Sequence, residues 1–177
     1  MSISLNGYTL PDSTIDKMKR FKRLSNETNE RSCFSLCTAN QNSHNKNIDI
    51  QEKNNIISRS PHKGKICSDI INPKCDPEET PVGIFRANPR QEYVNISYRD
   101  LRLAYQHGIV CVASKNEILC YSREGEYDKE TNQKILSTIE QDLKLRRVFR
   151  ELDQHHETVD KYVSTEFIKL NVYKRND

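Results

Sequence analysis

This 177-residue chain has six cysteines, whose thiols could bind a metal or form disulfide cross-links: Cys33, Cys37, Cys67, Cys75, Cys111 and Cys120. An even number of cysteines is compatible with disulfides. The first residues, however, lack the cationic and apolar segments of a signal peptide, and thiols stay reduced in a cytosol. We therefore expect unpaired thiols, with Cys111 and Cys120 packed in strands as small apolar side chains.

Two groups of residues contain the ligand types that zinc prefers. The first group is Cys33, Cys37 and His44, and the second is His62, Cys67 and Cys75. Structural zinc sites usually take their ligands in tight pairs such as C-x2-C, which neither group has. We expect no metal and no other cofactor.

Catalytic patterns are also absent from the sequence. His107 is close to Cys111 in sequence, but the end of a helix and the following strand do not by default bring a base to a nucleophile. His155 and His156 fall in a helical pattern in which a packed histidine is the simpler interpretation. No zinc-protease, phosphate-loop, serine-hydrolase or dinucleotide motif occurs.

The character of the chain changes near Pro81. Hydrophobic residues make up 34% of the sequence, and the mean hydropathy is −0.85, which predicts a core carried by only part of the chain. We expect three segments: residues 1–24 as a secretion-like start with a short helix, 25–74 as a largely disordered linker, and 75–177 as a compact domain.

The helix expected at residues 12–24 has a capping-box pattern at Ser13 and Asp16. Its remaining surface is basic. One interpretation is packing on the core with a solvated cationic face; the alternative is contact of residues 15–24 with an anionic membrane or a partner groove. A secretion chaperone is a further expected partner of this N-terminal region.

Residues 75–177 predict an α+β fold, namely a small antiparallel sheet with one short and one long helix. Strands are expected at residues 82–87 and 93–96, a helix at 97–107, a hairpin at 109–113 and 117–121, a long helix at about 129–163, and a last strand at 168–172. Ser97 and Asp100 form a capping-box pattern, and Gly108 stands where that helix should stop.

The nearly balanced numbers of positive and negative side chains bear on which class of partner the chain could bind. A net charge of +3 with 30% charged residues does not predict a nucleic-acid binder. A winged helix is a minor alternative, in which Arg99, Arg102 and Gln106 of the short helix would face DNA. No run of 18 apolar residues is present, which excludes a membrane span on length.

Two stretches resemble known families. Residues 75–85 (CDPEETPVGIF), 93–98 (YVNISY) and 114–118 (SKNEI) resemble the U-box-like region of NleG-type effectors, ubiquitin ligases that enteric pathogens inject into host cells. Asp76 stands where that family has proline, and the His-Pro-Leu loop of the family is absent. The resemblance implies ubiquitin ligase activity, with Ile84 and Phe85 as contacts for an E2 enzyme.

Residues 84–90 (IFRANPR) are similar to the first strand of ADP-ribosyltransferase toxins, in which an arginine helps to hold NAD. The likeness implies that role for Arg86. That family also has a serine-containing strand and a turn with the catalytic glutamate. By the same likeness, Ser114 and Ser122 would correspond to the strand and residues 124–126 to the turn.

Because no catalytic constellation emerges, the leading hypothesis is a non-enzymatic bacterial virulence effector. The whole-chain profile resembles effectors of type III-like secretion, which act in the host cytoplasm. We expect this protein to bind a host protein and to modulate host signalling. The expected binding residues are Ile84, Phe85 and Arg86 in the compact domain, with Arg147 and Arg150 on the charged face of the long helix. The ubiquitin ligase and the ADP-ribosyltransferase remain the alternatives.

Overall fold

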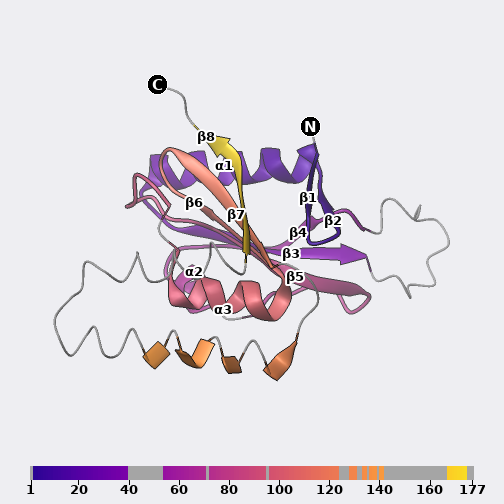
Figure 1. The fold of residues 1–177 in the computed structure, drawn as a ribbon. Helices are drawn as coiled ribbons and strands as arrows, with labels where there is room; N and C mark the ends of the chain where they lie inside the picture. The colour runs from indigo at the N-terminus through magenta and orange to yellow at the C-terminus, as the bar shows by residue number, and fades with distance from the viewer. Residues whose placement is uncertain are drawn as a thin grey trace.

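The computed structural model describes residues 2–39, 54–70, 72–94, 96–123, 128–130, 133–134, 136–138, 140–141 and 167–174. In this part of the chain a mixed sheet lies between two layers of helix, with α1 on one face and α3 on the other (Figure 1). The expected α+β class is confirmed. A separate hairpin of β1 (Ile3–Leu5) and β2 (Tyr8–Leu10) lies beside the sheet.

The sheet has the strand order β4-β3-β5-β6-β7-β8. Its strands are β3 (Ser32–Ala39), β4 (Ile57–Lys63), β5 (Glu79–Ala87), β6 (Ile109–Ala113), β7 (Glu117–Arg123) and β8 (Phe167–Lys174). All neighbours are antiparallel except β5 and β6, which are parallel. Gly83 allows that close pairing, because a Cβ at this position would lie 1.9 Å from the carbonyl oxygen of Ile109.

Several sequence expectations for this sheet are confirmed. The hairpin at 109–113 and 117–121 is β6–β7, the strand at 82–87 is part of β5, and the strand at 168–172 is part of β8. The strand expected at 93–96 is wrong for its described residues, which have no ladder partner. The winged-helix alternative is also wrong, because α3 connects two parallel strands as a crossover helix.

The expectation of a disordered linker over residues 25–74 is wrong for most of its described part. β3 lies inside the sheet between β4 and β5, and seven of its eight residues are buried. Cysteine, serine and threonine occupy most of its positions, so its sequence lacks the apolar signature of a central strand. The division at Pro81 therefore cuts through one folded unit, and residues 75–177 are only a part of it.

The N-terminal residues are also folded. Asn6 and Gly7 have φ angles of 52° and 81°, the backbone of a two-residue type I′ turn, for which Asn-Gly is the favoured sequence. The turn brings Leu5 and Leu10 into the core, where both are buried. Residues 2–24 are thus part of the folded domain.

Helix α1 (Asp12–Thr28) covers one face of the sheet. Ile15 and Met18 are buried in the same apolar cluster as Phe34 and Phe85 of the strands. The Ser13–Asp16 capping box is wrong, because the helix begins after Pro11 without a side-chain cap. The apolar face of α1 packs against the sheet, as the packed-helix interpretation predicts. That face is therefore not available for contact with a membrane.

Basic residues of α1 pack on aromatic rings rather than only in solvent. The Nζ atom of Lys17 lies 5.5 Å from the centroid of Phe34, and that of Lys22 lies 4.8 Å from the centroid of Tyr173. Such cation–π contacts allow long cationic side chains to cover an apolar surface.

Helix α3 (Tyr98–His107) covers the other face. The predicted capping box is confirmed, with Ser97 and Asp100 each bonded to the other's backbone N–H, and the helix stops at Gly108. Leu101, Ala104 and Tyr105 pack against β6 and β7. A short helix, α2 (Ile66–Asp69), lies on the same side.

The long helix expected at about 129–163 falls mostly outside the described residues. Helical positions are described between residues 129 and 141, and they lie beyond α3 in Figure 1. No helix in the described part of the chain is long and apolar enough to cross a membrane.

All six cysteines form disulfides, which corrects the expectation of free thiols. The pairs are Cys33–Cys67, Cys37–Cys75 and Cys111–Cys120. The last pair joins directly opposed residues of β6 and β7. The first two join β3 to the segment after β4, so the cysteines of both groups with zinc-type ligands are used in these cross-links.

The Cys33–Cys67 bond should contribute strongly to stability, because it closes a separation of 34 residues. In the chain-entropy model, the double variant Cys33→Ala/Cys67→Ala loses about 4 kcal/mol of unfolding free energy. Urea unfolding followed by circular dichroism measures the loss. A decrease below about 1 kcal/mol would contradict the expectation.

Candidate functional site

Two disulfides fasten a strap across one face of the sheet. We define the strap as residues 64–70 and 72–76. Cys33 and Cys37 both come from β3 and bind Cys67 and Cys75 of the strap. In addition, the backbone N–H of Lys74 donates to Ser35 Oγ at 2.8 Å. The strap therefore runs along β3 and covers side chains that would otherwise be exposed.

The strap and α3 share the same face of the sheet. Cys33 is the register partner of Arg86 on β5, and Arg86 Nη2 lies 3.1 Å from Asp100 Oδ1 on α3. The same guanidinium nitrogen donates to the carbonyl of Ile70 in the strap at 3.4 Å. Arg86 thus joins a strand, a helix and the strap at one point.

Two further arginines complete this junction. The guanidinium groups of Arg99 and Arg31 donate to the carbonyl and the hydroxyl of Ser68, respectively. His107, at the end of α3, lies with Nε2 3.4 Å from Oδ1 of Asn72. The junction is therefore a set of cationic and polar side chains directed at strap oxygens, which is an arrangement for holding a segment in place.

The imidazole of His107 has a displaced pKa. Burial, together with the positive charge of Arg123, lowers the pKa of its imidazole below the usual 6.5. The ring is accordingly neutral in the folded protein at neutral pH.

The structure buries two of the predicted binding residues. Ile84 and Phe85 are 1% and 0% exposed, and Phe85 stacks on Phe34 with ring centroids 4.7 Å apart. Neither offers a surface to an E2 enzyme, which corrects the expectation for these two residues. Arg147 and Arg150 lie outside the described residues.

Arg86 is likewise committed to the fold. Its side chain is 15% exposed and faces the carboxylate of Asp100, so a bound phosphate would have to displace that partner. Ser114 Oγ donates to the carbonyl of Glu92 at 2.9 Å, and Ser122 is buried. Residues 124–126, the matching turn of the transferase resemblance, lie outside the described residues.

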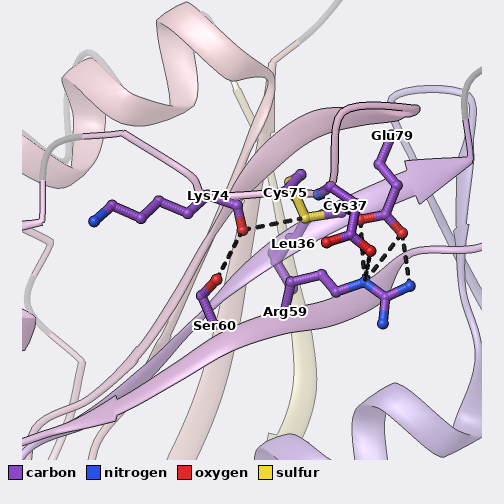
Figure 2. A network of polar contacts seen from close by, with 8 residues as sticks. Leu36, Cys37, Arg59, Ser60, Lys74, Cys75 and Glu79 are labelled. Atoms are coloured by element: carbon purple, nitrogen blue, oxygen red, sulfur yellow. Dashed lines mark hydrogen bonds and ion pairs between the residues drawn. A yellow bond between two sulfur atoms is a disulfide. The ribbon is translucent and has the colours of Figure 1, made fainter.

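A second polar network lies at the start of β5 (Figure 2). Glu79 accepts from Arg59 of β4 at 2.8 Å and from the backbone N–H of Asp76 at 2.9 Å. Burial is the largest single effect and raises the pKa of Glu79, but the hydrogen bonds from Arg59 and from the backbone N–H of Asp76, together with the positive charge of Arg59, outweigh it, so the net pKa is lowered. The ionised carboxylate lies beside the Cys37–Cys75 disulfide.

The third feature is a loop at the other end of β5. Tyr93 is 60% exposed and, with Ile66, is one of two exposed large hydrophobic side chains in the described residues. Backbone N–H groups of Lys115 and Asn116, in the β6–β7 turn, donate to the carbonyls of Gln91 and Glu92. The aromatic ring is thus displayed on a loop that is fixed to the sheet.

Comparisons with known proteins give no relative: no protein-family model and no curated protein matches the sequence. The function must therefore be argued from the geometry. The sequence analysis did not predict the strap. Two signals of it were present: the number of cysteines is even, and Cys33 and Cys37 are four residues apart, which places both on the same face of a strand.

Removing the charge of Arg86 should destabilise the protein, because it leaves Asp100 buried and uncompensated. Arg86→Met is expected to lose about 3 kcal/mol of unfolding free energy, measured by urea denaturation. Arg86→Met/Asp100→Asn keeps a capping oxygen without the charge and should recover at least half of the loss. Equal losses in the single and double variants would contradict this role of the ion pair.

The lowered pKa of His107 makes stability dependent on pH. As pH falls through the usual histidine value, the unfolded chain takes up a proton that the folded chain resists, so stability decreases between about pH 7.5 and 5.5. His107→Gln should flatten that slope in urea unfolding measured across the range. An unchanged slope would show that the imidazole is not its source.

Proposed function

We propose that this protein is a non-enzymatic effector that binds a partner protein through the surface around Tyr93. The observation that carries the proposal is an aromatic side chain, 60% exposed, on a loop whose backbone is fixed. Tyrosine is enriched among interface residues that dominate binding energy. A rigid aromatic side chain also loses little conformational entropy when a partner covers it.

Four hydrogen bonds support the rigidity of this loop. Lys115 N–H donates to Gln91 O at 2.8 Å, and Asn116 N–H donates to Glu92 O at 3.3 Å. Ser114 Oγ also donates to Glu92 O, and the backbone N–H of Val94 donates to Glu117 Oε1 at 2.9 Å. These contacts surround Tyr93 in sequence on both sides, so the loop is preorganised for binding.

The surroundings of Tyr93 suit a protein partner. Arg90, Glu92 and Lys115 are exposed near it in the same loop and turn, giving a rim of mixed charge around one aromatic side chain. An apolar centre with a polar rim is the usual composition of a protein–protein interface. A nucleic-acid partner would instead favour a rim of uniformly positive charge.

Three disulfides support an oxidising setting for the proposed binding. Every cysteine of the chain is paired, and such bonds persist in oxidising compartments. The proposed effector therefore folds and meets its partner outside a reducing cytosol, at a cell surface or in a secretory lumen. Our proposal therefore keeps export and the binding of a host protein from the sequence hypothesis. It replaces the host cytoplasm with an oxidising compartment.

The enzymatic alternatives have less support. The residues that the U-box likeness would use are buried, and the arginine of the transferase likeness is engaged by Asp100. Within the described residues, no nucleophile, base and acid are brought together. Binding without catalysis is therefore the function that these residues favour.

A selection from a displayed library of secreted protein domains tests the proposal, with the oxidised full-length protein immobilised. We expect enriched domains to lose at least about 30-fold in affinity for Tyr93→Ala, as truncation of a dominant interface residue would cause. Affinities are measured by biolayer interferometry.

The matched control is Ile66→Ala, which truncates the other exposed large side chain, 48% exposed. It should change affinity by less than about 3-fold. Domains that bind wild type and Tyr93→Ala equally well would overturn the proposed surface. Circular dichroism of both variants confirms that the fold is retained.

A further inference from the structure

We propose that opening the Cys37–Cys75 disulfide creates a Zn²⁺ site, formed by the two released thiolates and the carboxylate of Glu79. The inference is independent of the Tyr93 surface. It takes one cysteine from each of the two groups that the sequence singled out and adds Glu79, because the fold brings together residues from β3, the strap and β5.

The ligand atoms already lie at nearly the required separation. Cys37 Sγ, Cys75 Sγ and a carboxylate oxygen of Glu79 are all within 4.8 Å of one another. In a tetrahedral zinc site with Zn–S bonds of about 2.3 Å, two sulfurs are roughly 3.8 Å apart. Breaking the S–S bond therefore requires the sulfurs to separate by less than about 2 Å.

Accessibility makes this disulfide the first to open. Cys75 is partly exposed, whereas each of the other five cysteines is at most 1% exposed. A thiolate of a reducing dithiol attacks Cys75 Sγ, forms a mixed disulfide and releases the Cys37 thiolate. The second thiol of the dithiol then releases Cys75 and leaves the reductant as its own disulfide, so the two electrons are accounted for.

The reduced residues have acceptors in place. The carbonyl oxygen of Lys74 lies 4.0 Å from Cys37 Sγ, and that of Leu36 lies 3.8 Å from Cys75 Sγ. Thiol groups could donate to these oxygens before metal arrives. The Cys33–Cys67 bond continues to hold the strap, so the two thiols stay close together after reduction.

Arg59 is the competitor for Glu79. Its guanidinium donates to both carboxylate oxygens of Glu79 (Figure 2), and it also lies 3.5 Å from Asp76 Oδ2. Asp76 can therefore retain Arg59 when Glu79 turns to the metal. Three protein ligands leave a fourth position for water, as in open zinc sites.

Cobalt provides the test, because Co²⁺ takes tetrahedral zinc sites and shows thiolate-to-metal charge-transfer absorption. The protein is reduced with a phosphine under conditions in which peptide mapping shows one opened disulfide. We expect that bond to be Cys37–Cys75, and the reduced protein to bind one Co²⁺ with charge-transfer absorption that Zn²⁺ abolishes. The oxidised protein should show neither.

Two substitutions with opposite effects make the test specific. Glu79→Gln removes a ligand and should weaken Co²⁺ binding at least 10-fold. Arg59→Gln removes the competing cation and should tighten binding several-fold. A Cys37→Ala/Cys75→Ala variant, in which the Cys33–Cys67 bond still holds the strap, should show no absorption after the same treatment, which excludes other thiols as its source.

Three results would overturn the inference. The first is that Cys33–Cys67 opens before Cys37–Cys75. The second is the absence of charge-transfer absorption, or absorption unaffected by Glu79→Gln and Arg59→Gln. The third is loss of the native circular dichroism spectrum after selective opening, whether or not Co²⁺ is present.

Discussion

The attachment of the strap to β3 is the constraint on which one face of the sheet depends. β3 contributes Cys33, Ser35 and Cys37 to that face, which is a polar surface for an inner strand. Two disulfides and the bond from Lys74 N–H to Ser35 cover it with the strap. The covalent bonds supply there the stability that apolar packing supplies on the α1 face, where Phe34 and Leu36 point into the core.

The charged residues between the strap and α3 are held on the same face of the sheet. Asp100 has two partners, since it caps α3 through Ser97 and pairs with Arg86. A buried carboxylate needs compensation, and Arg86 provides it for Asp100. Arg86, Arg99 and Arg31 also donate to oxygens of the strap. Their role in the junction is thus structural, which explains why an arginine within a strand resembling that of a toxin does not by itself indicate an NAD site.

Local signals in the sequence predicted local structure well. The Ser97–Asp100 box and Gly108 bounded α3 correctly, and the short gap between two apolar runs predicted the β6–β7 hairpin. These features depend on neighbours within a few residues. The β1–β2 turn had the same kind of signal in Asn6-Gly7, which the sequence reasoning passed over.

Long-range features were not predicted because their stabilising contacts have no local pattern. β3 is polar and takes its place through pairing with β4 and β5 and through cross-links 34 and 38 residues away. Burial of Ile84 and Phe85 follows from that placement, since Phe34 of β3 stacks on Phe85. Tyr93 was read as part of a strand, and only the bonds from the β6–β7 turn show that it is displayed on a loop.

The two candidate sites occupy opposite ends of β5. Glu79 begins the strand beside the Cys37–Cys75 bond, and the Tyr93 loop follows Ala87 at its end. A strand of nine residues separates them by roughly 26 Å. The loop is held by bonds from the β6–β7 turn. If both proposals hold, opening the disulfide at one end of β5 should leave the Tyr93 loop at the other end in place, because that loop is fixed by the β6–β7 turn.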